Sequence, residues 1–231
     1  MDFVRYSDRH RTSLAHFLSK GKWDPAALEK NLRESIIEKV YQHGRETKQP
    51  VLCIIDDTIA SKTRPSSQAV HPMEATSDHM SHLKGRMDYG HQAIGVMLAC
   101  GELVLNYAIL LYDKSQSKID MVSSIANTLP EPPNIGYLLC DSWYTCDVEV
   151  FFRTTKGKLA LDKYQLRSAT GIRRFWLLMS LTHFLCCVGS GVLRSFSEGY
   201  EYWQTLVLRN VVQHVYNCGK NGTPLAMLGI G

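Results

Sequence analysis

The chain has 231 residues, 45% of them hydrophobic and 21% charged, and these ordinary globular proportions exclude a fibrous or wholly disordered protein. Its seven Cys residues form no CxxC pair, which argues against a disulfide framework and a zinc ribbon and predicts reduced thiols inside the cell. The net charge of +4 comes from two basic clusters. Residues 1–50 contain ten Lys or Arg against seven Asp or Glu, and residues 145–174 contain seven Lys or Arg against three Asp or Glu. These clusters predict either a polyanion-binding surface or two solvated helix faces.

Two helices are predicted at the start of the chain. A short helix begins near Thr12 or Ser13. A longer helix begins at Pro25, with Asp24 as its N-cap, and Gly44 is its predicted terminator. Its apolar residues recur at a spacing of four and form one face for burial: Leu28, Leu32, Ile36 and Val40.

Strands follow these helices. Residues 51–55 are a continuous, β-branched apolar run that ends at Asp56, which predicts a central strand buried on both faces. We expect a long loop over residues 61–88, because this segment is polar and contains two prolines. Residues 91–99 and 103–112 then predict a β-hairpin.

The second half of the chain is mostly helical in pattern. A helix is predicted over residues 115–128, then a buried strand over 136–140 that ends at Asp141, then helical segments from 147 with a last helix at about 200–217. Residues 175–193 carry no Asp, Glu, Lys or Arg and could span a membrane, but His183 and several Ser and Gly residues favour a buried core helix. This order of elements predicts a mixed sheet covered by helices.

The two buried strands each end in an aspartate, Asp56 and Asp141. If the strands are parallel neighbours, both carboxylates lie at one edge of the sheet, where open α/β sheets bind ligands and metals. Two carboxylates suit Mg²⁺ or Mn²⁺, although Asp is also a common turn residue at strand ends. Asp57 is an alternative ligand, but neighbouring residues of a strand point to opposite faces.

Glu149 is the nearest downstream candidate for a third carboxylate. On a helix it would share one face with Arg153 and Lys156, and the pattern fits either a metal ligand or an ordinary surface salt bridge.

Four histidines lie close together in the sequence, His71, His79, His82 and His91. His79 and His82 could bind a transition metal, but no Cys or acidic pattern completes a zinc site, so a solvated loop is favoured. His91 begins a strand beside Asp56 and is expected to pack there or to support the site.

Several sequence blocks occur in a fixed order. They are IIDDT at residues 54–58 followed by Lys62, GHQ at 90–92, DSWY at 141–144, Glu149 with Lys156 seven residues later, and YQLRS at 164–168. Together they resemble the DDE transposases of bacterial insertion sequences, over residues 3–195. The resemblance implies a ribonuclease H-like core in which Asp56, Asp141 and Glu149 bind two Mg²⁺ or Mn²⁺ ions.

The implied fold is α/β, a ribonuclease H-like mixed sheet of about four core strands flanked by helices. Residues 1–48 would form an N-terminal helical DNA-binding segment. Residues 49–195 would form the catalytic core, truncated between residues 145 and 147. Residues 196–231 would form a C-terminal helical tail.

The resemblance also implies double-stranded DNA as the partner, both transposon ends and target. The basic candidates for contacts with its phosphates are Lys156, Arg153, Lys158 and Lys62. Trp143 and Tyr144 could stack on an unpaired base or pack in the core. We further expect self-association, no membrane association and a cytoplasmic bacterial protein that joins the nucleoid when bound to DNA.

The sequence departs from the family between the second and third acids. Ser142 and Thr145 stand where the family block has Tyr and Arg, and only seven residues separate Asp141 from Glu149. Family members have a further strand and helix there, and usually an insertion, so we interpret the chain as carrying an internal deletion. We expect an exposed sheet edge, an imperfect approach of Glu149 to the aspartates, and impaired catalysis.

Three functions are consistent with the sequence. The first is a DDE transposase, impaired in this copy. The second is a catalytically inactive remnant that binds DNA or intact transposase subunits. The third is a metal-dependent nuclease unrelated to transposition.

Overall fold

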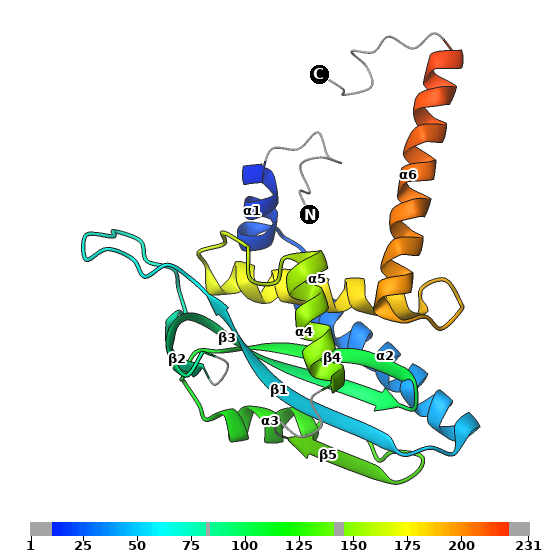
Figure 1. Ribbon diagram of the computed structural model, residues 1–231, viewed down its shortest axis with the longest axis horizontal. Coiled ribbons are helices and arrows are strands. Elements are labelled where there is room, and N and C mark those ends of the chain that lie inside the picture. Colours follow the sequence, from blue (N-terminus) through cyan, green and yellow to red (C-terminus); the bar gives the residue numbers. More distant parts are fainter. Residues whose placement is uncertain (1–10, 82–83, 141–145, 222–231) are drawn as a thin grey trace.

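A computed structural model describes residues 11–81, 84–140 and 146–221 (Figure 1). The helices are α1 (Arg11–Lys20), α2 (Pro25–Thr47), α3 (Lys118–Ala126), α4 (Cys146–Leu159), α5 (Ala169–Val188) and α6 (Phe196–Lys220). The strands are β1 (Val51–Ser61), β2 (Ser77–Ser81), β3 (Arg86–Cys100), β4 (Leu103–Tyr112) and β5 (Gly136–Cys140).

The five strands form one mixed sheet. β1 lies between β3, to which it is antiparallel, and β5, to which it is parallel, while β2 and β4 both pair with β3. The helix α3 lies between β4 and β5 in the chain, as a crossover to a parallel strand requires. The predicted α/β class, with a ribonuclease H-like mixed sheet flanked by helices, is confirmed.

Two strand predictions need correction. The structure places β2 and the first residues of β3 within the segment predicted to be a loop, and β1 continues past Asp56 to Ser61. In both places backbone pairing with β3 holds polar residues in extended conformation, with Asp56 opposite Gly95 and His79 opposite Asp88. The local sequence pattern does not predict strands of this kind, because they are stabilised by hydrogen bonds to a strand that is distant in the sequence.

The helix ends also differ from the prediction. Asp24 caps α2 as expected, since its Oδ1 accepts from the backbone N–H groups of Ala26 and Ala27 at 2.9 and 3.1 Å. Gly44, however, does not end the helix, which continues to Thr47 and stops at Lys48, whose φ of 59° is left-handed. Gly44 is buried instead, and its carbonyl accepts from Asn134 Nδ2 at 2.7 Å.

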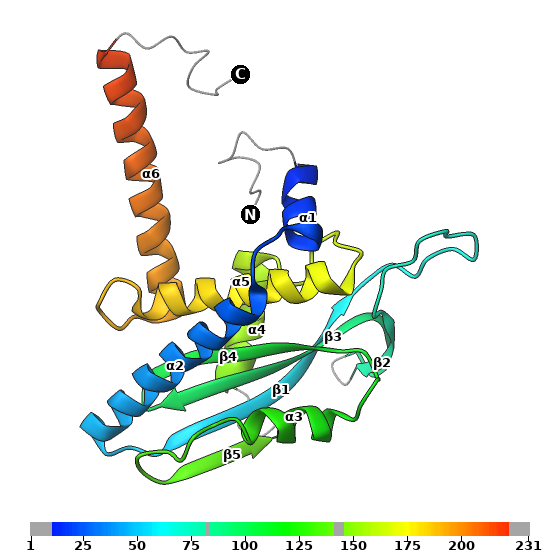
Figure 2. The same ribbon diagram turned by 180° about the vertical axis from the view of Figure 1, so that it is seen from behind.

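Helices cover both faces of the sheet, with α2 on one face and α4 on the other (Figures 1 and 2). The apolar core is correspondingly divided in two. The core on the α2 face includes Ile36 and Val40 of α2, Ile55 of β1 and alternate residues of β3. The core on the α4 face includes Phe151 and Phe152 of α4, Ile54 of β1 and Trp176 of α5.

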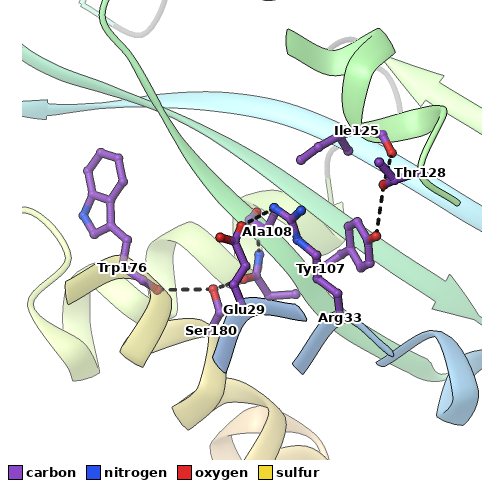
Figure 3. Close-up of polar contacts among 9 residues, drawn as sticks. Glu29, Arg33, Tyr107, Ala108, Ile125, Thr128, Trp176 and Ser180 are labelled. Carbon is purple, nitrogen blue, oxygen red and sulfur yellow. Dashed lines mark hydrogen bonds and ion pairs between the residues drawn. The ribbon is translucent and has the colours of Figure 1, made fainter. Parts of the chain in front are cut away.

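A β-bulge and a polar network join the sheet to its helices. Met97 pairs with Asn106 and Val96 with Ala108, so Tyr107 is the extra residue of β4. Figure 3 shows Tyr107 beside Arg33 of α2, with its hydroxyl 3.3 Å from that of Thr128. The amide of Asn106, which is 1% exposed, accepts from Ser180 Oγ of α5 at 2.6 Å and donates to the carbonyl of Ala108. These bonds satisfy polar groups that would otherwise be costly to bury.

The apolar segment near residue 180 belongs to α5, which buries Trp176, Met179 and His183 in the core. Among the helices described, none has the length and apolar character needed to cross a lipid bilayer. The interpretation as a core helix is confirmed.

Candidate active site

The alternation of side chains along β1 decides which of its two aspartates faces α4. Ile54 and Thr58 point to the α4 face, because Ile54 belongs to the core on that face and Thr58 Oγ1 accepts from Lys156 Nζ of α4 at 2.6 Å. Ile55 and Asp57 point to the other face, where Asp57 Oδ2 accepts from Lys118 Nζ of α3 at 2.6 Å. Asp56 therefore lies on the α4 face.

The carboxylate of Asp56 is partly exposed at this position, and its Oδ1 accepts from the backbone N–H of Asp57 at 2.7 Å. The carboxylate of Asp57 is committed to an ion pair with Lys118 on the opposite face. This geometry favours Asp56 over Asp57 as a ligand on the side of α4.

The carboxyl end of β5 lies beside Asp56. The parallel pairing of β1 and β5 runs from Val51 with Gly136 to Ile55 with Cys140, and Asp56 is the next residue of β1. Asp141, the next residue after Cys140, lies outside the described residues, as do Trp143 and Tyr144. Beyond Ile55, β1 continues to pair with β3 on its other side.

The helix α4 crosses the sheet next to Asp56. Gly95 pairs with Asp56, and a Cβ placed on Gly95 would lie 2.7 Å from Cζ of Phe152. The aromatic ring therefore rests directly on the backbone of β3, and only glycine permits so close an approach. Glu149 lies in α4, three residues before Phe152, and its side chain is outside the described part of the structure.

The basic residues of α4 differ in their surroundings. Lys156 is half-buried, and its burial lowers the pKa of the ammonium below its ordinary value. Lys158 lies 3.6 Å from a carboxylate oxygen of Glu201 and 5.1 Å from the ring centroid of Tyr200. Arg153 is exposed. Of the three, Arg153 is the most accessible to a polyanion.

Lys62 has an internal role that its sequence position did not indicate. Its Nζ donates to the backbone carbonyls of Asp162 at 2.6 Å and Tyr164 at 3.1 Å, and it lies 3.8 Å from the ring centroid of Tyr164. Burial lowers the pKa of Lys62 to about 8. The side chain joins the end of β1 to the loop that connects α4 and α5.

The same loop contacts His91, which is fully buried. Its Nε2 donates to the carbonyl of Glu74 at 2.8 Å, so its Nδ1 accepts from the hydroxyl of Tyr164 at 2.9 Å. Burial lowers the pKa of His91, in keeping with this neutral form. His91 is thus buried, as a packing role requires, but it pairs with Ala60 and not with Asp56, and β3 begins at Arg86 and not at His91. His79 is buried next to Ser77 Oγ at 2.9 Å, whereas His82 lies outside the described residues.

The donor chemistry of the site fits a hard divalent cation. Asp56 supplies a carboxylate on the α4 face. In the sequence, Asp141 directly follows β5, the parallel neighbour of β1, and Glu149 lies within α4. Carboxylate oxygens are the ligands that Mg²⁺ and Mn²⁺ prefer. Among the side chains that the structure describes, no three His, Cys, Asp or Glu residues form a metal-binding group, and this set excludes Asp141 and Glu149.

Comparison with known proteins identifies the family of the chain. The profile of the DDE superfamily endonuclease family matches residues 4–178, from the N-terminal segment into α5. No curated protein and no solved structure matches the chain. The match covers well over half of the sequence, including β1, β5 and α4, and the chain therefore belongs to the DDE superfamily endonuclease family.

Proposed function

We propose that the protein is the DNA transposase of an insertion sequence, which cuts transposon ends and joins their 3′-hydroxyl groups to target DNA, and that this copy is impaired. The observation that carries the proposal is the position of Asp56. It lies on the face covered by α4, directly after the last residue of β1 that pairs with β5. The second acid follows β5 and the third lies in α4.

Chain connectivity supports a shared site. The carbons Cα of paired residues on neighbouring strands lie about 5 Å apart, and each further residue adds at most ~3.8 Å. Because Ile55 pairs with Cys140, the Cα atoms of Asp56 and Asp141 are within about 13 Å of each other for any local conformation. Side chains of this length can meet at a metal pair about 4 Å across.

The protein residues would divide the work as follows. Asp56, Asp141 and Glu149 would hold two Mg²⁺ or Mn²⁺ ions, which supply an activated water or 3′-hydroxyl and stabilise charge at the phosphorus. Lys156, fixed by Thr58 next to Asp56, would place its ammonium beside the scissile phosphate. Arg153 and Lys158 would bind the DNA backbone on either side, which positions the strand without reading its sequence.

The proposed impairment comes from the short connection between β5 and α4. Only residues 141–145 join them, and residues 146–221 form helices and loops, without a strand that could cover β5. Tyr137 and Leu138 of β5 are accordingly 51% and 52% exposed. A missing strand beside β5 removes packing that would fix the catalytic carboxylates, and errors of about 1 Å can cost on the order of 100-fold in rate.

A DNA-binding remnant is the second candidate. It is favoured by one observation, the seating of α4 on the sheet through Phe152 at Gly95 and Lys156 at Thr58. These contacts hold the basic helix in place whether or not the three carboxylates meet. The protein could therefore still bind DNA after losing the ability to cleave it.

Cleavage of DNA carrying the element's own ends, with Mg²⁺ or Mn²⁺, separates the candidates. Slow cutting confined to the ends supports the impaired transposase. Binding that weakens with salt, without cutting, supports the remnant, because phosphate contacts release counterions. Cutting that ignores the ends would indicate a nuclease unrelated to transposition, and strand transfer at a rate typical of working transposases would refute impairment.

A matched pair of variants tests the metal site directly. Asp56→Asn retains an oxygen that can accept from the N–H of Asp57, and we expect it to weaken Mn²⁺ binding at least about tenfold with little loss of stability. Asp57→Asn removes the partly exposed ion pair with Lys118, which costs up to ~1 kcal/mol, and should leave Mn²⁺ affinity unchanged. Calorimetric titration and thermal melts measure both. Unchanged metal affinity in Asp56→Asn would exclude it as a ligand.

A further inference from the structure

The loop between β1 and β2, residues 62–76, projects from the body of the protein, and we call it the arm (Figures 1 and 2). Loops of this length are uncommon in compact domains and are usually either functional or disordered. Residues 63–72 of the arm are all exposed, and Val70 is 83% exposed. This part of the arm therefore does not contribute to either apolar core.

The arm is held in place at its base. On the side that leaves β1, the guanidinium of Arg64 lies 4.9 Å from the ring centroid of Tyr89 in β3. On the returning side, Arg167 Nη1 donates to the carbonyl of His71 at 3.2 Å, and the N–H of Glu74 donates to the carbonyl of Arg167 at 2.9 Å. A loop fixed on both sides presents its tip in a defined position, which lowers the entropic cost of binding a ligand.

The tip of the arm is a turn that displays hydrogen-bonding side chains. The N–H of Ala69 donates to the carbonyl of Ser66 at 3.1 Å, and the ring of Pro65 fixes the backbone just before this turn. Three successive polar side chains of the turn are exposed: Ser66, Ser67 and Gln68. Within the described part of the chain, none of these three side chains forms a hydrogen bond, so their donors and acceptors are available to a ligand.

The charges of the arm are compatible with DNA. From Thr58 to Met73 the sequence contains no Asp or Glu, so no carboxylate of this segment repels a polyanion. The exposed side chain of Arg167 lies next to the arm and adds a positive charge there.

The uncharged tip suits the edges of bases better than phosphates. A Gln amide can form two hydrogen bonds with adenine in the major groove, and a Ser hydroxyl can bond to several bases. Phosphate contacts, in contrast, are made largely by Lys and Arg, and the tip has neither between Pro65 and Pro72. The chemistry of the tip therefore favours recognition of base pairs.

The arm begins on the same side of the sheet as the candidate catalytic residue Asp56. Lys62, its first residue, bonds to the loop between α4 and α5 and follows Asp56 by six residues, which at about 3.3 Å per residue places it about 20 Å away. Gln68 follows Asp56 by twelve residues and can lie at most ~43 Å from it. At about 3.4 Å per base pair, the tip can reach DNA within roughly thirteen base pairs of the cleavage site.

We propose that the arm enters the major groove of double-stranded DNA beside the cleavage site, where Gln68 recognises an adenine. This inference rests on the proposed action of the protein on DNA, and it adds a specificity-determining residue outside the three carboxylates. The arm would thus select the sequence at which the site acts.

Enrichment from a pool of DNA duplexes with a randomised centre, without metal so that no strand is cut, tests the proposal. We expect the full-length wild-type chain to enrich sequences with adenine at one position, and Gln68→Ala to lower this preference about tenfold or more. Gln116→Ala is the matched control. Gln116 is exposed in the loop before α3, on the face of the sheet opposite Asp56, and its replacement should leave the preference unchanged.

A salt titration of the binding of fluorescent duplex DNA, followed by anisotropy, separates base contacts from phosphate contacts. The slope of log affinity against log salt should be the same in Gln68→Ala and in the wild type, because a neutral side chain releases no counterions. A shallower slope in Gln68→Ala would overturn base recognition by this residue.

The outcomes also separate this inference from the proposed function. A wild-type chain that binds no DNA would overturn both. A wild-type chain that binds DNA without enriching any sequence, or an adenine preference that Gln68→Ala leaves intact, would overturn the role of the arm alone. Thermal melts check that both variants fold, which is expected because both residues are exposed.

Discussion

Replacing Gly95 with alanine tests whether α4 is seated on the sheet beside Asp56. The added Cβ would lie 2.7 Å from Cζ and 3.2 Å from Cε2 of Phe152, against at least 3.4 Å for ordinary contact. The ring of Phe152 is 4% exposed within the core on the α4 face, so it cannot turn into solvent. Either the ring or the whole helix must retreat by about 0.7 Å.

The expected cost follows from two opposing effects. Overpacking of a core typically destabilises a protein by ~1–3 kcal/mol, whereas replacing Gly with Ala restricts the unfolded chain and recovers about 0.4–1 kcal/mol. We therefore expect Gly95→Ala to lower the free energy of unfolding by roughly 1–2 kcal/mol. Phe152→Leu should also destabilise the protein, but the double variant should be no less stable than Phe152→Leu, since the shortened side chain leaves room for Cβ.

Urea denaturation of the four proteins measures this cycle. Gly157→Ala in α4 is the control, because a Cβ there meets no atom within 4 Å. It should stabilise the protein by about 0.5–1 kcal/mol through helix propensity alone. Strict additivity of the Gly95 and Phe152 substitutions, or wild-type stability of Gly95→Ala, would refute the close contact between α4 and β3.

Three further predictions concern buried charge and the sheet edge. Lys62→Met leaves the carbonyls of Asp162 and Tyr164 without their donor and should cost about 1–3 kcal/mol in urea denaturation. Burial lowers the pKa of Lys62 from 10.5 to about 8, so the unfolded chain holds this proton more tightly than the folded protein does. The stability of the wild-type protein should therefore rise between pH 8 and 10.5. An equal rise in Lys62→Met would show that Lys62 does not cause it. Burial also lowers the pKa of His183 from 6.5 to about 3, so stability should fall as the pH drops from 6.5 towards 3. Thermal melts of His183→Phe should show a shallower fall over this pH range. An unchanged slope in the variant would show that His183 is not the group responsible. Leu138→Lys on exposed β5 should slow aggregation in light-scattering assays and change the free energy of unfolding by no more than about 0.5 kcal/mol. Unchanged aggregation would show that the β5 edge is not the surface through which the protein aggregates.

Much of the fold could be predicted where short-range chemistry dominates. The Asp24 cap followed by Pro25 starts α2 at the predicted residue, and the apolar run after residue 50 lies in the central strand. The strands β4 and β5 have the predicted bounds, whereas β3 begins five residues before its predicted start and β5 is mostly exposed instead of buried. In each case the signal lies within a few residues, in a cap, a period or a turn. The roles of Asp141 and Glu149 remain predictions, because their side chains lie outside the described part of the structure.

The sequence by itself determined the order of the elements other than β2, the α/β class and the blocks that resemble the family. Only the tertiary structure decided which face Asp56 occupies, that β2 and the end of β1 are strands, and that Lys62 serves the loop between α4 and α5 rather than the surface. It also decided that the valines of α6 lie in solvent rather than in the core. The physical reason is the same throughout. Caps and periodicity act between neighbours in the chain, whereas strand pairing, burial and the partner of a charged group depend on residues that are distant in sequence and meet only in the folded protein.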